Sequence, residues 1–304
     1  MTTTYAVIGT GVVGERIIHQ LVQHEQSSIT AIYDENRERL AEMATKYNVP
    51  AVASLEELFA TSPQWVYIGT PPLSHAPLTK RIAEKGFNIL CEKPLAHDAA
   101  DGEAMVAAAK HVTTAMHFPM MYSPAVARLH EAVQSGELGH IERIELHTHF
   151  PVWPRPWQQN PWIATRAQGG FIREIFPHYL QLTHHIFGDV TIEAHQTNYP
   201  ADETLCETSV SALLKTTGGI PMLINAAAGI AQQERIDYKV YGSKKSMIIR
   251  DWAQLLTLTA DEEEVALSLQ PAAFTLLDAC NTKTAIVQFE EGLKIQRWID
   301  ELLV

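Results

Sequence analysis

Three glycines near the start of the sequence have the spacing of a phosphate-binding turn. Gly9, Gly11 and Gly14 follow the apolar run 5–8 as G-x-G-x-x-G, and apolar residues with a helical period come after them. The first glycine permits a tight turn, the second lets the backbone approach a pyrophosphate, and the third lets the helix pack closely on the strand. Unpaired N–H groups at the helix N-terminus attract the anion. The pattern predicts a dinucleotide site, and an ordinary strand–turn–helix is the alternative.

An acidic residue stands where a ribose-binding carboxylate is expected. Asp34 ends the predicted strand 29–33, twenty residues after Gly14. A carboxylate there accepts hydrogen bonds from the ribose hydroxyls of NAD and repels the 2′-phosphate of NADP. Asp34 could also cap the following helix, and Arg37, one turn further on, could bind that phosphate instead. We therefore predict NAD as cofactor, with NADP as the alternative.

Two further predicted strands end in residues that can reach a ligand. Gly69-Thr70-Pro71-Pro72 follows the strand 65–68, and its prolines exclude a helix directly after that strand. Glu92-Lys93-Pro94 follows the strand 87–91, although charged residues are rarely buried unless they are paired. Both runs reach the carboxyl edge of the sheet, where ligands lie in open α/β folds. The predicted cofactor-binding residues are Gly9, Thr10, Gly11, Val12, Val13, Gly14, Asp34, Arg37, Thr70, Pro71, His75, Glu92 and Lys93; for His75 a role in capping a helix is the alternative.

The residues up to 118 alternate between strands and helices. Alternation of this kind indicates an α/β fold with a doubly wound parallel sheet, a Rossmann domain over residues 1–118. Its six expected strands lie at 5–8, 29–33, 51–52, 65–68, 87–91 and 113–118.

From residue 119 the pattern changes, and we expect a second α/β domain over residues 119–304. Helices are expected at 124–134 and from about 171 to 188. A large, mostly antiparallel open sheet is expected from strands at 142–150, 191–198, 207–216, 222–229, 235–241 and 246–250. A terminal helix over 283–303 closes the chain and could pack back on the first domain.

Composition limits the classes of function. The 304 residues carry a formal net charge of −12, which argues against nucleic acid or an anionic membrane as partner. Three widely spaced cysteines indicate reduced thiols, and no apolar run approaches the ~20 residues of a membrane span. Since the first strand begins near Thr4, a signal peptide is not expected. We expect a soluble, cytoplasmic protein.

Taken together, these motifs resemble the Gfo/Idh/MocA family of NAD(P)-dependent oxidoreductases over essentially the whole chain. The resemblance implies hydride transfer between a nicotinamide and a hydroxyl-bearing carbon of a sugar, inositol or related polyol. It also implies a homodimer or homotetramer formed through the sheet of the second domain. The motifs that carry it are Gly9 to Gly14, Gly69-Thr70-Pro71-Pro72 with His75, Glu92-Lys93-Pro94, Gly136-Glu137-Leu138-Gly139, Gly169-Gly170 up to His178, and Tyr241-Gly242-Ser243-Lys244.

The resemblance also implies catalytic residues. The family's lysine corresponds to Lys93, which would hydrogen-bond the reacting oxygen. Its histidine corresponds to His178, an imidazole suited to proton exchange near neutral pH. Its acid, more often Asp, corresponds to Glu174, four residues earlier and on the same helix face. The alternatives are a solvated lysine at a strand end for Lys93 and a buried core histidine for His178.

Substrate contacts are less specific in the sequence. Met116-His117-Phe118 replaces a run that often contains arginine in relatives, which suggests a less polar or less anionic substrate. Three tryptophans, Trp153, Trp157 and Trp162, lie within ten residues; their rings could stack on a sugar or fill a gap between the sheet and the domain boundary. The predicted substrate-binding residues are Tyr122, Trp153, Arg155, Trp162 and Arg166, and the arginines could instead pair with surface acids.

Three rival functions stay open. A non-catalytic NAD(P)-binding sensor would need neither Lys93 nor His178, and a methyltransferase would not need Glu92-Lys93-Pro94. A metal enzyme is disfavoured because no acid or cysteine stands at ligand spacing from His147, His149 or the pair His184-His185. Within the enzyme class, a dihydrodiol or an imine is the alternative substrate.

Overall fold

The computed structural model describes residues 2–158 and 160–304. The described residues divide into two compact units, one within 2–118 with 274–296, and one within 119–158 and 160–273 with 297–304.

The first unit contains a five-stranded sheet in which every pair of strands is parallel. The strand order is β2-β1-β3-β4-β5. The strands are β1 (Thr3–Ile8), β2 (Ser27–Tyr33), β3 (Trp65–Ile68), β4 (Asn88–Cys91) and β5 (Thr114–Met116). The prediction of a doubly wound parallel sheet is confirmed. The expected strand at 51–52 is wrong: Ala51 forms only an isolated bridge with Ile32, because the chain passes β2 for a single residue before turning into the next helix.

The helices of this unit fall into two groups. They are α1 (Val12–Gln23), α2 (Arg37–Tyr47), α3 (Leu55–Ala60), α4 (His75–Glu84) and α5 (Ala99–Ala109), with a short 3₁₀ turn at Pro72–Ser74. Along the sheet, β2 lies on one side of β1, whereas β4 lies on the opposite side of β3. Right-handed crossovers therefore place α1 and α4 on opposite faces of the sheet. The direction reverses between β1 and β3, which is where such folds bind ligands.

The central strands are buried on both faces. All four residues of β3 and the last four of β1 are buried, and the Tyr5 and Trp65 rings stack with centroids 6.5 Å apart. Strands of this kind read as continuous apolar runs, since helices cover both faces of the sheet.

The end of the chain differs from its prediction. The helix expected at 283–303 is shorter in the structure, α9 (Phe289–Leu302), and a helix that was not predicted, α8 (Leu276–Thr282), precedes it. Thr275 and Asp278 form a capping box that starts α8, and Lys283 ends it in the left-handed conformation. Asn281 of α8 accepts a hydrogen bond from the Tyr5 hydroxyl at 2.7 Å, so α8 packs on the first unit. Residues 289–296 of α9 group with the first unit and 297–302 with the second.

The second unit contains an eight-stranded sheet with the order β13-β12-β11-β10-β6-β9-β8-β7. Within the described residues its pairs are antiparallel except β6 with β9. The mostly antiparallel open sheet is thereby confirmed. The sequence interpretation did not contain β12 and β13, which follow a turn at 251–253. The strands are β6 (Ile141–Phe150), β7 (Val190–Asn198), β8 (Ser209–Thr216), β9 (Pro221–Ala228), β10 (Arg235–Gly242), β11 (Ser246–Arg250), β12 (Gln254–Leu258) and β13 (Val265–Ala266).

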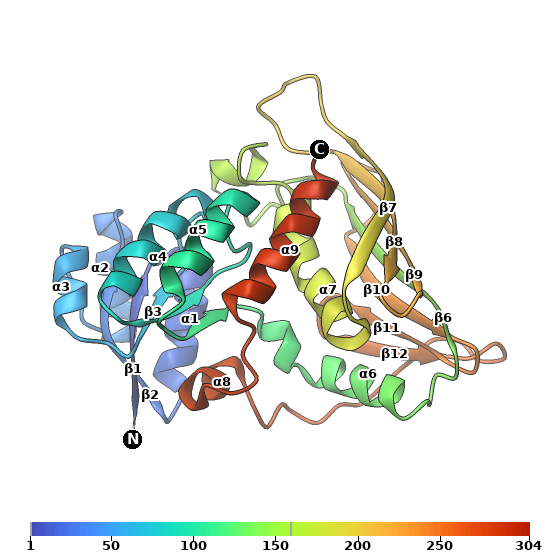
Figure 1. The fold of residues 1–304 in the computed structure, drawn as a ribbon, viewed down its shortest axis with the longest axis horizontal. Helices are drawn as coiled ribbons and strands as arrows, with labels where there is room; N and C mark the ends of the chain where they lie inside the picture. The colour runs from blue at the N-terminus through green and yellow to red at the C-terminus, as the bar shows by residue number, and fades with distance from the viewer. Residues whose placement is uncertain (1, 159) are drawn as a thin grey trace. The chain divides into compact units, whose positions relative to one another are not determined.

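One long helix, α7 (Phe171–Phe187), covers one face of this sheet beside α6 (Pro124–Gln134) (Figure 1). The Tyr179 ring of α7 stacks on Tyr238 of β10 at 5.8 Å, and Thr183 shares a 3.0 Å hydrogen bond with the Tyr238 hydroxyl. Alternate residues of β8 and β9 are buried against the helices and exposed on the other face. The sheet thus holds α7 in a defined rotation about its axis.

None of the helices within 2–158 and 160–304 has the length and apolar character needed to cross a membrane.

The glycine turn offers a matched pair of stability tests. A Cβ at Gly14 would stand 2.0 Å from the Gly9 carbonyl oxygen, whereas a Cβ at Gly11 would meet no heavy atom within 4 Å. We expect Gly14→Ala to lower the free energy of unfolding by about 2–3 kcal/mol through overpacking. Gly11→Ala should cost about 1 kcal/mol or less, as the loss of a helix N-cap glycine. Urea denaturation measures both, and equal losses would contradict the packing role of Gly14.

Candidate functional site

The first part of the site is the turn from β1 into α1. Gly9 has φ +91°, and a Cβ there would lie 2.7 Å from the Gly69 backbone, so the ends of β1 and β3 touch at this glycine. The N-cap of α1 is Gly11, and no side chain caps the helix. The first N–H groups of α1 are therefore available to an anion, and the space above Gly11 is open.

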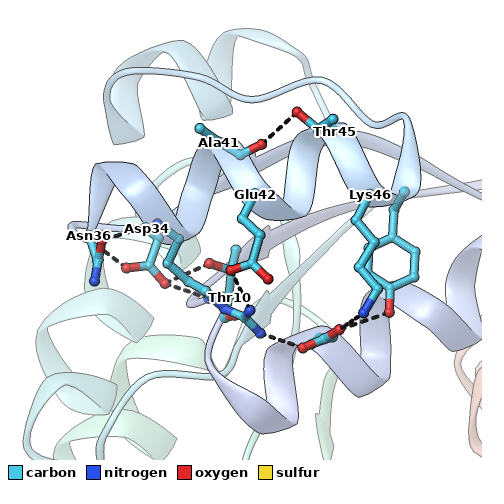
Figure 2. Close-up of polar contacts among 10 residues, drawn as sticks. Thr10, Asp34, Asn36, Ala41, Glu42, Thr45 and Lys46 are labelled. Atoms are coloured by element: carbon cyan, nitrogen blue, oxygen red, sulfur yellow. Dashed lines mark hydrogen bonds and ion pairs between the residues drawn. The ribbon is translucent and has the colours of Figure 1, made fainter.

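Asp34 follows β2 beside this turn. Its Oδ2 accepts hydrogen bonds from the Thr10 N–H at 2.6 Å and the Thr10 hydroxyl at 2.9 Å, and its Oδ1 accepts from the Asn36 N–H at 2.8 Å (Figure 2). Asn36, not Asp34, is the N-cap of α2. These bonds hold the carboxylate at the turn while leaving part of its acceptor capacity unused.

The arginines near Asp34 are engaged within the protein. Arg37 donates to the Ala53 carbonyl at 2.7 Å. Arg39 donates to the Thr10 carbonyl at 2.9 Å and pairs with Glu15 and Glu42. A hydrogen bond from Lys46 to Glu15, helped by Arg39, lowers the pKa of Glu15 to about 2. The network ties the first turn of α1 to α2 and so positions the phosphate-binding turn.

His75 is fully buried and does not face open space. One ring nitrogen lies 2.8 Å from the Thr70 carbonyl and the other 3.0 Å from the Leu95 carbonyl. Burial lowers the pKa of His75. The imidazole thus joins the loop after β3 to the segment that follows Glu92-Lys93-Pro94. Both loops of the ligand edge depend on it for their position.

Glu92 is the buried centre of this edge. Its side chain is 6% exposed, and its Oε1 accepts from the Tyr67 hydroxyl at 2.7 Å and lies 2.7 Å from His117 Nδ1. Burial alone would raise the pKa of Glu92. The charge and hydrogen bond of His117, the charge of Lys93 and the Tyr67 hydrogen bond outweigh burial and lower that pKa to about 2. Glu92 is therefore an ionised carboxylate shared by three neighbouring strand ends.

Lys93 follows Glu92 and is partly exposed at the same edge. Its backbone N–H donates to Glu92 Oε2 at 3.3 Å, and the Lys93–Pro94 bond is cis. The lysine is held by its own neighbour in the sequence, and its side chain stands beside a buried negative charge.

In the second unit, the N-terminus of α7 donates a hydrogen bond to a buried carboxylate. Glu207 is 2% exposed, and its Oε1 accepts from the Ile172 N–H at 2.7 Å. Burial raises the pKa of Glu207. Gly170 has φ +96°, and a Cβ there would lie 2.2 Å from Glu207 Oε2. A Cβ at Gly169 would lie 2.3 Å from the Ile163 carbonyl oxygen. The glycine pair is required because this carboxylate and the preceding loop press on the start of α7.

Glu174 and His178 lie one turn apart on α7, and both are partly exposed. The His178 ring stands edge-on to Trp252, with centroids 5.1 Å apart and an interplanar angle of 88°. Trp252 has φ +75° and Asp251 has φ +46°, in the turn between β11 and β12. The structure thus places both predicted residues together and adds Trp252 as the ring that fixes His178.

Arg155 lies among the aromatic side chains of residues 150–158. The Arg155 guanidinium lies 5.6 Å from the Trp153 ring centroid and 4.8 Å from that of Trp157, and it pairs with Glu234 at 3.3 Å. Cation–π contacts and this ion pair hold the segment in place. Arg155 is buried, so its guanidinium is committed to the segment itself. Substrate contact by Arg155 and Trp153 stays a prediction.

The remaining predicted substrate residues occupy separate places in the second unit. Tyr122 ends a 3₁₀ turn before α6, and Trp162 lies in another at Pro161–Ala164; both are partly exposed. The Arg166 guanidinium stacks on the Tyr199 ring at 3.8 Å.

Metal-ligand groupings are sparse in the described chain. His147 lies 3.2 Å from a Glu145 oxygen, and His184 lies 2.8 Å from a carboxylate oxygen of Asp189. One group of three, His97, Asp98 and Asp101, brings its potential ligand atoms within 4.8 Å of one another. Asp98 there caps α5 by accepting from the Asp101 N–H. The expectation of no metal stays a prediction.

Four residues that the sequence interpretation left without a role support these sites: Tyr67, His117, Glu207 and Trp252. His117 stands in a run that departs from the family pattern, which is the one signal that marked it. The other three act through partners that are distant in sequence, and no local pattern marks such contacts.

Comparison with known proteins identifies the family. The sequence model for the GFO/IDH/MocA oxidoreductase family, NAD-binding Rossmann fold, matches residues 3–118, and the model for the GFO/IDH/MocA C-terminal domain matches residues 126–248. The chain belongs to the Gfo/Idh/MocA family. Residues 3–118 accordingly have the NAD-binding Rossmann fold of that family.

Curated relatives are distant in sequence. D-apiose dehydrogenase of Paraburkholderia graminis is 25% identical over 242 residues, which cover 76% of this chain and 62% of that protein. The scyllo-inositol 2-dehydrogenase (NADP(+)) IolU of Bacillus subtilis is 33% identical over 108 residues, covering 35% of this chain and 33% of the relative. The chain spans less than two thirds of the length of both relatives.

Solved structures show the same fold. Levoglucosan dehydrogenase in complex with NADH superposes with a TM-score of 0.84 at 18% identity, covering 99% of this chain and 96% of that chain. A 3-ketoreductase from Actinomadura kijaniata in complex with NADP gives a TM-score of 0.84 at 18% identity, with 99% and 97% covered. At such identities the likeness establishes the fold.

The lowered pKa of Glu92 predicts a pH-dependent stability. A depressed folded-state pKa means that the ionised carboxylate stabilises the fold above its ordinary value of 4.5, and that this contribution is lost as the pH falls toward 2. We expect Glu92→Gln to lower the free energy of unfolding by about 1–3 kcal/mol at pH 7. The deficit should shrink below about pH 4.5. Urea denaturation across pH measures it, with the exposed Glu203→Gln as control. A deficit that is constant with pH would contradict the ionised state of Glu92.

Proposed function

We propose that the protein is a dehydrogenase or reductase that transfers a hydride between NAD and a hydroxyl-bearing carbon of a sugar, inositol or related polyol. The observation that carries this proposal is Glu92-Lys93 at the carboxyl edge of the Rossmann sheet, with the Glu92 carboxylate ionised and buried beside Lys93. The relatives support the substrate class: they include an apiose dehydrogenase, and an inositol 2-dehydrogenase of Rhizobium meliloti that is 24% identical over 255 residues.

The residues at the glycine turn fit a dinucleotide. The start of α1 has no side-chain cap, and the space at Gly11 is open to a pyrophosphate. Asp34 has acceptor capacity left for ribose hydroxyls, and its charge opposes a 2′-phosphate. Arg37 is engaged with the Ala53 carbonyl, which favours NAD over NADP. Thr10, Val12, Val13, Thr70 and Pro71 complete the proposed cofactor contacts.

Lys93, His178 and Glu174 are the proposed catalytic residues. The cofactor supplies the hydride acceptor when it is bound. The Lys93 ammonium donates a hydrogen bond to the reacting oxygen and stabilises the negative charge that develops there during oxidation. His178 accepts the hydroxyl proton and returns it in the reverse direction. Glu174, one turn away on α7, and the Trp252 ring set the position of that imidazole.

A non-sugar substrate is the second candidate. Trans-1,2-dihydrobenzene-1,2-diol dehydrogenase of Mus musculus is 26% identical over 229 residues, and the segment 150–162 of this chain is rich in tryptophan. Aromatic side chains stack on a flat apolar ring as readily as on a sugar. A sensor that binds NAD without turnover is the remaining alternative.

The two parts of the chain have different roles in this proposal. Residues 1–118 act as the dinucleotide-binding domain, and residues 119–304 as the substrate-binding and oligomerisation domain. The face of the large sheet turned away from α7 carries Leu213 and Leu223, which are 40% and 37% exposed. Apolar exposure on a sheet face favours a protein partner. We assign a homodimer or homotetramer through this face, and a cytoplasmic location.

Removing the lysine tests the mechanism. We expect Lys93→Ala to lower kcat/KM by about 10³-fold, because the transition-state charge loses its main donor. The Kd for NADH by calorimetry should change by less than about threefold, since the phosphate-binding turn is untouched. Turnover is followed by NADH absorbance on a panel of aldoses, inositols, polyols and dihydrodiols. Lys80→Ala, an exposed lysine on α4, is the control. Wild-type activity in Lys93→Ala would refute this mechanism.

Cofactor choice is tested at Asp34. Asp34→Ala should raise the Kd for NADH about tenfold and the Kd for NADPH much less, so that the preference moves toward NADPH. Its physical basis is the loss of ribose hydrogen bonds together with the loss of charge repulsion. Glu35→Ala removes the neighbouring exposed carboxylate as a control. An unchanged ratio of the two constants would show that Asp34 does not select the cofactor.

A further inference from the structure

His117 stands at the same sheet edge as Glu92 and Lys93. Its backbone N–H donates to the Cys91 carbonyl at 2.7 Å, just as the Glu92 N–H donates to the Ile68 carbonyl at 2.9 Å. The parallel ladder therefore continues one residue past β3, β4 and β5. The backbone of His117 is fixed beside that of Glu92 by the sheet itself.

One ring nitrogen of His117 is committed. Nδ1 lies 2.7 Å from Glu92 Oε1, and the same oxygen accepts from the Tyr67 hydroxyl. The Tyr67 ring stands edge-on to the imidazole, with centroids 5.9 Å apart. Because an ionised carboxylate can only accept, Nδ1 carries the proton in this pair. A carboxylate that holds Nδ1–H in this way fixes both the tautomer and the orientation of the ring.

The other ring nitrogen has no assigned function within the protein. His117 Nε2 is buried and has no hydrogen-bond partner among the described residues. Buried polar atoms are nearly always paired, so an exception at a ligand edge calls for a donor from outside the chain. In the tautomer that carries its proton on Nδ1, the imidazole presents a lone pair at Nε2, which is an acceptor.

Charge decides which donor fits. The groups that contact His117 from the adjoining strand ends are the ionised Glu92 and the neutral Tyr67, and the Lys93 cation follows Glu92 in the chain. A substrate carboxylate or phosphate would bring no hydrogen-bond donor to the Nε2 lone pair and would lie near the ionised Glu92. A neutral hydroxyl can donate to Nε2 without cost. The environment therefore favours a neutral, polyhydroxylated compound over an acid.

We propose that His117 is a substrate-binding residue whose Nε2 accepts a hydrogen bond from a second hydroxyl of the substrate, one that is not oxidised. This inference rests on the proposed function and deepens it, because it restricts the substrate to compounds with a donor hydroxyl near the reacting carbon. Glu92 is then the positioning residue that holds the imidazole ready.

His117→Asn tests the proposal with little change elsewhere, since the Asn amide nitrogen can take the place of Nδ1 while nothing replaces Nε2. The probes are the aldose or inositol of the panel with the highest kcat/KM and its monodeoxy analogues. We expect the wild type to prefer the parent compound over one analogue by about 10–100-fold, the effect of one unpaired hydrogen-bonding group. In His117→Asn this preference should fall below about threefold, mainly through KM, with the Kd for NADH unchanged.

His111→Asn is the matched control, because His111 precedes β5 at its other end and its Nε2 contacts the Ala83 carbonyl at 2.8 Å. An unchanged preference in His117→Asn would overturn the proposal. A loss confined to the Kd for NADH would overturn it too, since Nε2 would then serve the cofactor. Absence of turnover by the wild type across the panel would instead refute the proposed function itself.

A second measurement does not depend on activity. In protein labelled with ¹⁵N at histidine, the signals missing from His117→Asn identify the ring. We expect a protonated Nδ1 and an unprotonated Nε2, with the Nε2 shift moving when the parent compound is added in the presence of NADH. A protonated Nε2 at neutral pH would overturn the proposal. A ¹⁵N chemical shift of Nε2 that does not change when the compound is added would overturn it too.

Discussion

A buried carboxylate must be paired, and at the edge of the Rossmann sheet that requirement organises the surroundings of Glu92. Its two oxygens are in hydrogen-bond contact with the Tyr67 hydroxyl, the His117 imidazole and the Lys93 N–H, which come from three neighbouring strand ends. Leaving any of them unpaired in the interior would cost about 1–3 kcal/mol. The position of Lys93 is therefore a consequence of how the charge beside it is satisfied.

The second unit also contains a buried carboxylate that must be paired, at the start of α7. Glu207 accepts the Ile172 N–H, and the glycine pair Gly169-Gly170 leaves room for that carboxylate. The same helix carries Glu174 and His178, and its rotation is set by Tyr179 and Thr183 against Tyr238 of the sheet. In both units a buried acid fixes the element on which the proposed chemistry depends. Of these two acids, Glu92 was marked in the sequence by the run Glu92-Lys93-Pro94, and Glu207 was not marked by any local pattern.

Predictions from the sequence succeeded where the signal was local. The spacing of Gly9, Gly11 and Gly14 predicted the turn into α1, and the buried runs predicted β1 and β3. They failed where neighbours decide the outcome. The run 51–52 was predicted to be a strand, but Ala51 forms only an isolated bridge with Ile32. The terminal helix begins at Phe289 because Lys283 closes α8 in the left-handed conformation and the intervening residues do not continue it.

The amino-acid sequence by itself determined the alternation of strands and helices, the phosphate-binding turn, the acid at Asp34 and the fold class, because each depends on short-range periodicity or on a backbone conformation that few residues adopt. Only the tertiary structure decided the partners of the functional side chains. His75 joins two loops through carbonyls that lie 5 and 20 residues away, Arg155 is held by rings and an acid within its own unit, and His117 is fixed on Glu92. Such contacts depend on which strand ends the topology brings together, and strand order is a property of the folded sheet, which no local pattern contains.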